Sequence, residues 1–240
     1  VIGKDILRFH TIYWPIMLMA LDIPLPKKIF GHPWLLSGND KMSKSKGNVM
    51  YADDLVKRFG VDPIRFYLLS EMPYAQDGTI SYENIVTRFN SELANTLGNL
   101  VNRTVSMVNK YFGGVIPAPA EDDEFAKDLK ETALKTVAVV KEKIDEYKVS
   151  DAVSEIFSLL RRSNKYIDET APWVLAKNEE DKEKLGSVMY NLLETIRISA
   201  VLLSSFMPET SEAILKQINS SLLSWESIQS FGGIKPGDSV

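Results

Sequence analysis

The sequence contains no cysteine, only two histidines, and no apolar run long enough to cross a bilayer. The lack of cysteine excludes disulfides and thiolate-bound zinc. His10 and His32 are too few for a histidine-based metal site. We therefore expect no metal site in this segment and no membrane-spanning helix. The absence of disulfides also suits a reducing compartment, so a cytoplasmic location is expected.

Positive charge is also scarce. The chain has 28 Lys and Arg against 32 Asp and Glu, a net charge of −4. Residues 1–80 carry 10 basic and 8 acidic residues, a net of +2, and residues 81–240 carry 18 and 24, a net of −6. A bulk electrostatic attraction to nucleic acid is therefore excluded. An RNA partner would need a local basic strip and a few specific contacts.

The amino-terminal residues predict the end of an α/β domain. Residues 5–20 are mostly apolar and aromatic, which favours a buried helix that is kinked or restarted at Pro15. Met17 and Met19 are expected in its core. Residues 27–36 are expected to be extended. A helix followed by a strand is typical of the last unit of an α/β sheet.

Residues 36–80 predict a polar, basic loop followed by two short helices, at 52–59 and 62–71. Asp62 is expected to cap the second helix. Residues 73–80 are expected to form a loop.

After residue 80 long segments with a helical period dominate, separated by short breaks rich in glycine and proline. The expected helices are 81–112, 122–148, 150–170, 179–206 and 209–222. Short connections between long helices predict an antiparallel bundle. The positions expected in its core include Leu93, Leu97, Leu100, Val101 and Val105. The fold class is therefore mainly α, preceded by the end of an α/β domain.

The strongest chemical signal is KMSKS, at Lys41 to Ser45, which with Lys46 places three lysines within six residues. Such a loop suits nucleotidyl transfer, because ammonium groups stabilise the negative charge that grows on a pyrophosphate leaving group. Serine hydroxyls add hydrogen bonds, and Gly47 allows the loop to change shape. The alternative is a solvated basic loop, since a pentamer of this composition taken alone is more often that.

Four segments carry a family resemblance, in order along the chain. KMSKSKGN (41–48) is similar to the second signature of the class I aminoacyl-tRNA synthetases. Three further segments resemble the methionine-specific branch of that family: GKDILRFHTIYWPIMLMALDIPLP (3–26), ANTLGNLVNRTVSMVNKYF (94–112) and DETAPWVLAK (168–177). The resemblance implies three parts: the end of a class I Rossmann catalytic domain (1–35), the KMSKS loop with a stem-contact segment (36–80), and an α-helical anticodon-binding domain (81–240).

The resemblance also implies an ATP site, with ATP and Mg²⁺ as substrate. Lys44 would be the main contact to the ATP phosphates and Lys41 would assist it. Met42, Ser43 and Ser45 would complete the ATP-binding loop.

The resemblance assigns further roles near the amino terminus. Gly3, Lys4 and Asp5 match a segment that approaches the adenosine of ATP, where the Asp5 carboxylate could accept from ribose hydroxyls. His10 matches a histidine of the methionine pocket. Without that match, His10 would more simply be a core histidine of an apolar helix.

Asn99, Arg103 and Trp173 are the candidates for recognition of RNA bases. Asn99 and Arg103 are four residues apart and so share one helix face. An amide and a guanidinium can bind base edges, and an indole beside Pro172 can stack on an unpaired base. From spacing alone these would be a solvated amide, a surface ion-pair partner and a core aromatic. The resemblance assigns them to the CAU anticodon of tRNA(Met).

Two departures from the family pattern matter. Asp40 stands where the family often has glycine before KMSKS, which could weaken the affinity of the loop for phosphate. The first class I signature, HIGH, does not occur. We therefore expect the chain to be the carboxy-terminal portion of a longer enzyme, and to be inactive without the amino-terminal catalytic half.

Two other functions stay open at this point. A helical tRNA anticodon-binding module without catalysis would explain the bundle, but it would have no use for the KMSKS loop. A synthetase of related specificity, for isoleucine, valine, leucine or cysteine, would keep KMSKS, but the APW segment and the Asn99 and Arg103 pair argue against it.

Overall fold

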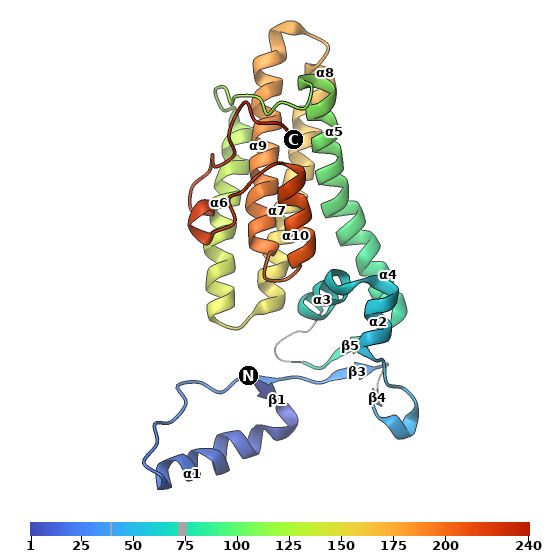
Figure 1. Cartoon of the computed structure of the whole chain (residues 1–240), viewed down its shortest axis with the longest axis vertical. Helices are drawn as coiled ribbons and strands as arrows, with labels where there is room; N and C mark the ends of the chain where they lie inside the picture. Colours follow the sequence, from blue (N-terminus) through green and yellow to red (C-terminus); the bar gives the residue numbers. More distant parts are fainter. Residues whose placement is uncertain (39, 72–75) are drawn as a thin grey trace.

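The computed structural model describes residues 1–38, 40–71 and 76–240. Figure 1 shows an elongated molecule with a helical bundle at one end and the amino-terminal segment at the other. The part of the chain around β3 to α4 lies between them. In the described residues, no helix is long and apolar enough to cross a membrane.

The amino-terminal segment is a β–helix–β unit: the predicted helix and following strand are present, and a short strand that was not predicted precedes them. Strand β1 (Ile2–Gly3) pairs in parallel with β2 (Gly31–His32). The crossover contains a 3-10 turn (Lys4–Ile6), a π-helical turn (Phe9–Tyr13) and α1 (Trp14–Ala20). A parallel pair joined through a helix is the repeating unit of a Rossmann sheet.

The expectation that this helix is buried is wrong for the chain by itself. Phe9 is 58% exposed, and Met17 and Met19, expected in the core, are 62% and 66% exposed. A single β–helix–β unit has no second layer to cover the other side of its helix. The apolar composition of residues 5–20 therefore leaves an uncovered apolar surface here.

The middle segment forms a small three-stranded sheet in the order β4-β3-β5. Strand β3 (Leu35–Ser37) pairs antiparallel with β4 (Asp40–Lys41) and parallel with β5 (Gly78–Ile80). Between β4 and β5 lie α2 (Ala52–Phe59) and α3 (Val61–Ser70). A separate small core holds this unit together: Leu55, Ile64, Tyr67, Ile80 and Ile85.

Two expectations for this segment need correction. The loop expected over 73–80 is a strand at 78–80, stabilised by pairing with β3, which local sequence does not reveal; residues 72–75 lie outside the described part. Gly60, with φ 87°, precedes the first residue of α3. Asp62 lies inside the helix instead of capping it, and its Oδ2 accepts from the amide of Thr210, 2.6 Å away, at the start of α10.

The long helices expected in the bundle are present, together with a short helix at 172–175 that the sequence does not predict. It consists of α4 (Tyr82–Arg88), α5 (Asn99–Phe112), α6 (Glu124–Asp145), α7 (Val149–Thr170), α8 (Pro172–Leu175), α9 (Lys182–Leu203) and α10 (Pro208–Gln217). The helix expected over 81–112 is continuous but changes to π-helical geometry over Phe89–Gly98. The last helix ends at Gln217, short of the expected residue 222.

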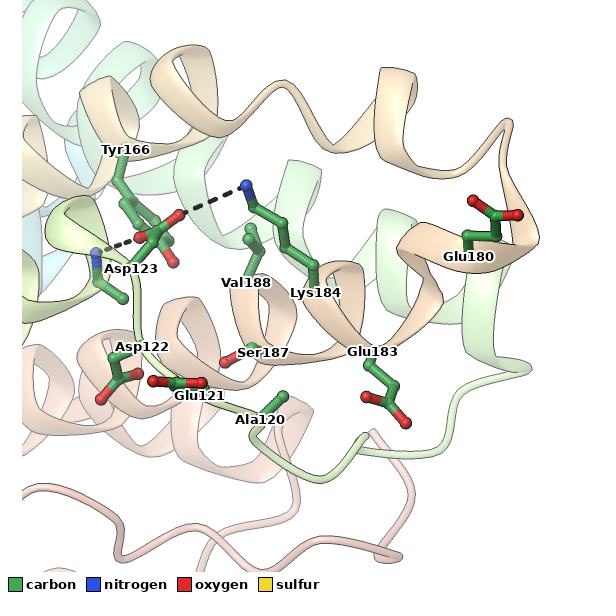
Figure 2. Close-up of a pocket in the computed structure, with 11 residues that line it drawn as sticks. Ala120, Glu121, Asp122, Asp123, Tyr166, Glu180, Glu183, Lys184, Ser187 and Val188 are labelled. Carbon is green, nitrogen blue, oxygen red and sulfur yellow. Dashed lines mark hydrogen bonds and ion pairs between the residues drawn. The ribbon is translucent and has the colours of Figure 1, made fainter.

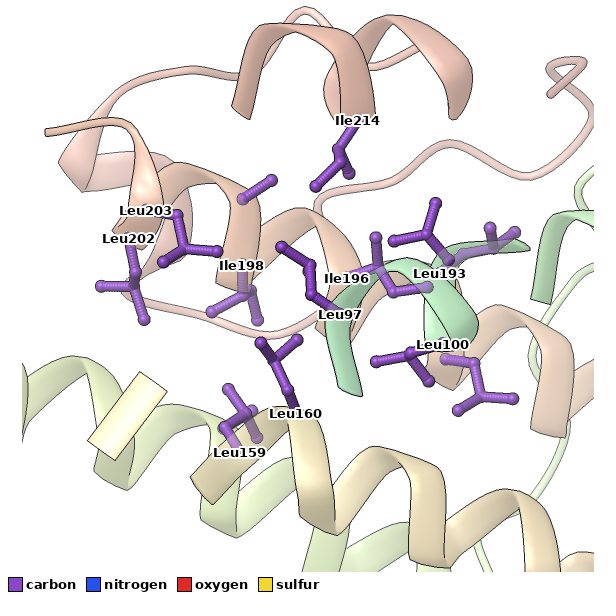
Figure 3. Close-up of a cluster of buried hydrophobic side chains, with 14 of the residues drawn as sticks. Leu97, Leu100, Leu159, Leu160, Leu193, Ile196, Ile198, Leu202, Leu203 and Ile214 are labelled. Carbon is purple, nitrogen blue, oxygen red and sulfur yellow. The ribbon is translucent and has the colours of Figure 1, made fainter. Parts of the chain in front are cut away.

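Helix α9 is the centre of the bundle. Every residue from Leu185 to Leu203 is buried. Helices α5, α6, α7, α8 and α10 all pack against it. Figure 3 shows the interdigitated core, including Leu97 and Leu100, Leu159 and Leu160 of α7, and Leu193 and Ile196 of α9. Leu93, also expected in the core, is partly buried and packs against it.

The segment after α10 returns across the bundle. A 3-10 turn (Trp225–Ile228) packs against α9, and the final residues run beside the loop that follows α5. The amide of Ile116 donates to Asp238 O at 2.8 Å, and the amide of Val240 donates to Gly114 O at 2.8 Å.

Candidate functional sites

The KMSKS loop is closed by side-chain hydrogen bonds between its two ends. The Oδ1 of Asn48 accepts from the amide of Ser43 at 2.9 Å, and its Nδ2 donates to Lys41 O at 3.4 Å. The Ser43 hydroxyl caps a 3-10 turn over Lys44–Lys46 by accepting from the Lys46 amide at 3.2 Å. Gly47 ends the turn with φ 66°, where a side chain would be strained. The loop therefore has a defined fold that leaves its lysine side chains exposed.

The three lysines of the loop have different surroundings. The Lys46 ammonium pairs with Asp40 Oδ1 at 3.2 Å, which places this acidic residue against Lys46 and not Lys44. Lys44 is exposed, and in the described part of the chain its ammonium has neither an ion pair nor a hydrogen bond. A cation without a protein partner can bind an incoming anion without first breaking an ion pair.

Lys41 joins a second cluster, built on Trp34. The Lys41 ammonium lies 4.5 Å from the centre of the Trp34 ring, and the Lys4 ammonium lies 4.3 Å from it. Lys4 also pairs with Asp77 Oδ1 at 2.5 Å, and the same oxygen accepts from the Trp34 amide at 3.0 Å. These two hydrogen bonds hold the pKa of Asp77 below its ordinary value. Segments far apart in sequence thus bring two ammonium groups against one ring.

Gly3 and Asp5 flank Lys4 at the end of β1. A Cβ at Gly3 would lie 2.5 Å from Oδ1 of Asp5, so glycine is what allows this carboxylate to approach the backbone. His10 is half-buried, with Nδ1 3.0 Å from Ile6 O and its ring in edge contact with Trp14. The structure therefore places Gly3, Lys4 and Asp5 at the start of the helical crossover between β1 and β2, and His10 within that crossover.

Ser45 and Met42 are the two other residues expected to complete the ATP-binding loop. Ser45 Oγ lies 3.0 Å from Ser43 Oγ, on the exposed side of the loop. Met42 packs against the small core of the middle segment. Met42 thus anchors the loop, and Ser45 stays accessible.

At the other end of the molecule, α5 carries Asn99 and Arg103. Asn99 is exposed, and Arg103 is partly exposed one turn later. Arg103 Nη2 lies 3.5 Å from Asp168 Oδ1 on α7. This exposed and long ion pair contributes little stability, so an RNA base or phosphate could displace it.

Trp173 stands on a sharp turn. Ala171 adopts φ 41°, which ends α7, and Pro172 starts the four-residue helix α8. Trp173 is 43% exposed, which argues against the interpretation of this residue as a packed core aromatic. Asp168 precedes Trp173 by five residues and contacts Arg103, so α5 is in contact with the end of α7 that leads to Trp173.

The same end of the bundle contains a pocket of about 410 Å³. Figure 2 shows acidic side chains around it, among them Asp122, Asp123 and Glu183. Lys184 Nζ lies 3.7 Å from Asp123 Oδ2. None of the candidate ATP-binding, methionine-pocket or anticodon-binding residues predicted from the sequence lines this pocket.

Sequence reasoning missed Trp34, Asp77 and Asn48. Asn48 could have been identified from its position at the end of the loop, because an Asn side chain commonly closes a turn by hydrogen bonding to the backbone. Trp34 and Asp77 carry no local signal, because their contacts join residues 43 and 73 positions apart. In the described residues, no group of three or more His, Cys, Asp or Glu side chains could hold a metal ion.

Comparisons with known proteins match two parts of the chain. Residues 1–105 match the family described as tRNA synthetases class I (M). Residues 116–236 match the anticodon binding domain of methionyl tRNA ligase. The chain is 54% identical over 239 residues to the methionine–tRNA ligase of Clostridium tetani, and 51% identical over 238 residues to that of Bacillus subtilis. These matches cover 100% and 98% of the chain.

The chain spans only 37% and 36% of the length of these two curated relatives. Among solved structures, it is similar to Mycobacterium tuberculosis methionyl-tRNA synthetase in complex with methionyl-adenylate, with a TM-score of 0.95 and 38% identity. That match covers 99% of this chain and 47% of the other. The chain therefore belongs to the methionine-specific family of class I aminoacyl-tRNA synthetases, and includes its anticodon-binding domain.

Proposed function

We propose that this chain is the carboxy-terminal part of a methionine–tRNA ligase, which activates methionine with ATP, releases pyrophosphate and transfers the methionyl group to tRNA(Met). In this part, the KMSKS loop binds ATP and the bundle recognises the CAU anticodon. The observation that carries the proposal is the exposed Lys44 ammonium, unpaired among the described residues, on a loop whose backbone is fixed by Ser43 and Asn48. A non-catalytic anticodon module has no use for such a loop.

The chemistry requires positive charge at the leaving group. Attack of the methionine carboxylate on the α-phosphate moves negative charge onto pyrophosphate, and Lys44 stabilises that charge more in the transition state than in the ground state. Lys41 assists from its position on Trp34. Mg²⁺ enters with ATP as part of the substrate.

The adenosine end of ATP lies toward Gly3, Lys4 and Asp5 in this proposal. Lys4 and Lys41 share the Trp34 ring, so the residues assigned to the two ends of ATP belong to one cluster. The Asp5 carboxylate accepts from the ribose hydroxyls, and His10 contributes to the methionine pocket.

The partner on the catalytic side is the amino-terminal half of the same enzyme. Its site on this chain is the uncovered apolar surface of residues 6–25, which includes Phe9, Ile16, Met17 and Leu21, each more than half exposed. An apolar surface of this extent on a sheet-forming unit is typical of an interface with the rest of a domain. The chain spans only 37% of the length of its Clostridium tetani relative, which also supports a further part of the same enzyme as the partner. The isolated chain is then inactive in methionine activation.

The bundle binds the anticodon loop through Trp173, Asn99 and Arg103. The indole stacks on an unpaired base, and the amide and guanidinium bind base edges. The net charge of the chain is −4, so affinity comes from these specific contacts more than from bulk attraction.

The test is a titration of this chain with a fluorescent anticodon stem-loop that bears CAU, against one with the anticodon reversed to UAC, each at two salt concentrations. We expect a preference for CAU that survives the higher salt, since base contacts do not release counterions. Equal, salt-sensitive binding of both stem-loops would contradict the assignment of the three residues.

A further inference from the structure

The turn between α6 and α7 touches the β1–β2 unit at the far end of the bundle from Trp173. The ring of Tyr147, in this turn, stacks on the ring of Phe30, with 5.3 Å between centroids and 10° between planes. The Lys28 ammonium lies 4.4 Å from the centre of the same Tyr147 ring. A residue within the match to the anticodon binding domain thus contacts Phe30, the residue before β2.

The backbone conformation of Tyr147 supports a specific role for its side chain in the stack on Phe30. Its φ is 64°, in the left-handed region that glycine normally occupies after a helix. The Tyr147 amide donates to Ile144 O at 2.9 Å, and the Lys148 amide donates to Lys143 O at 2.8 Å, which closes the end of α6. Glycine would make the same turn without strain. The turn therefore does not require a tyrosine, whereas the stack on Phe30 does require a ring.

A continuous set of contacts leads from Phe30 to the ATP loop. The carbonyl oxygen of Phe30 accepts from the amide of Ile2 at 2.9 Å, which holds β1 in place. Strand β1 continues into Lys4, whose ammonium lies on the Trp34 ring beside that of Lys41. Any displacement of Phe30 therefore moves the strand that positions Lys4, and with it the Trp34 cluster.

We propose that Tyr147 is a positioning residue for the ATP site: through Phe30 and β1 it holds Lys4 and the Trp34 cluster in the geometry that binds ATP. The helical bundle thereby supports methionine activation even when no tRNA is bound. This inference rests on the proposed function, and it concerns the same site. Tyr147 itself touches neither substrate nor anticodon.

The test uses the full-length enzyme that contains this chain, with the variants Tyr147→Gly and Tyr147→Phe. Glycine removes the ring and relieves the left-handed strain, so the turn keeps its fold. Phenylalanine keeps the ring that stacks on Phe30 and removes only the hydroxyl. Methionine-dependent exchange of pyrophosphate into ATP is measured without tRNA, with ATP varied to separate KM from kcat. Affinity for the CAU stem-loop is measured in parallel.

We expect Tyr147→Gly to raise the KM for ATP about two- to tenfold, the range that one aromatic pair supports. The phenylalanine variant should restore the original KM. Affinity for the stem-loop should stay unchanged in both. Helix α8, which contains Trp173, lies at the opposite end of the bundle from the α6–α7 turn (Figure 1), and Arg103 pairs with Asp168 near the end of α7.

Three outcomes would overturn the inference. An unchanged KM for ATP in Tyr147→Gly shows that the ring does not position the site. An equal loss of stem-loop affinity and exchange shows a general loss of folding in place of positioning. Absence of exchange in the unaltered full-length enzyme overturns the proposed function itself, and is distinguished from the first two because it needs no variant.

Discussion

The guanidinium of Arg197 donates two hydrogen bonds to the carboxylate of Glu194, at 2.7 and 2.8 Å, and both side chains are completely buried in α9. The same carboxylate accepts from the amides of Gly232, Gly233 and Ile234, at 2.8 to 2.9 Å. Arg197 also donates to Ser227 O at 2.9 Å. This pair therefore fixes the returning carboxy-terminal segment to the centre of the bundle.

Removal of Glu194 should strongly destabilise the bundle. Glu194→Ala leaves the Arg197 charge buried without its partner, which typically costs about 3–5 kcal/mol. Urea unfolding of the isolated chain measures the change. The control is Glu179→Ala, which breaks an exposed pair with Lys182 at the same three-residue spacing and should cost less than about 1 kcal/mol. Similar losses in the two variants would show that the buried network is not what holds the segment.

Replacement of Lys44 should slow methionine activation in the full-length enzyme. Loss of one group that stabilises transition-state charge typically lowers kcat by about 10²–10³-fold. Lys44→Ala should leave affinity for tRNA unchanged. Pyrophosphate exchange measures the first effect and a stem-loop titration the second. Lys46→Ala is the matched control. The Lys46 ammonium already pairs with Asp40, so its removal should lower the exchange rate much less. Unaltered exchange in Lys44→Ala would mean that the phosphate role is wrong.

Truncation of Trp173 should weaken binding of the CAU stem-loop by roughly 1–3 kcal/mol, the contribution of one stacked base. The exposure of the indole means that folding should be nearly unaffected. Fluorescence titration and thermal unfolding of Trp173→Ala separate the two effects. Val174→Ala, at the exposed neighbour in α8, should bind like the unaltered chain. A Trp173→Ala chain that unfolds would instead support a packing role.

Tyr166 should make the bundle lose stability at high pH. Burial raises the pKa of its hydroxyl from 10.0 to about 12. The unfolded chain then loses this proton before the folded chain does. The stabilisation is therefore complete below pH 10 and is lost as the pH rises toward 12, by roughly 2–3 kcal/mol. Urea unfolding at about pH 9 and about pH 11.5 measures the free energy of unfolding. Its decline between the two pH values should be smaller in Tyr166→Phe than in the unaltered chain. Equal declines would contradict the assignment.

Local sequence was sufficient wherever the physical cause is local. Helix α2 begins and ends where the sequence predicts, because Gly60 closes it with a positive φ. The bundle breaks at Gly113 and Pro208 for the same kind of reason. The buried faces at Leu97, Leu100 and Val101 follow from helical periodicity. The KMSKS loop and the candidate base-contacting residues also follow from the sequence, through its resemblance to a family.

Other features could not be predicted because their causes are distant in sequence. Strand β5 exists because β3 pairs with it. Asp62 does not cap its own helix, and its carboxylate accepts a hydrogen bond from the amide of Thr210 at the start of α10. Met17 and Met19 have the composition of a core, but burial depends on whether a second layer covers them.

The sequence by itself therefore determined the helical bundle, the position of its breaks, the basic loop and the family to which the chain belongs. Only the tertiary structure decided which ammonium groups share the Trp34 ring, that Lys44 has no partner among the described residues, and that Tyr147 stacks on Phe30. The reason is that helix periodicity and turn chemistry act over a few residues, whereas these contacts join segments whose approach is fixed by packing of the whole chain.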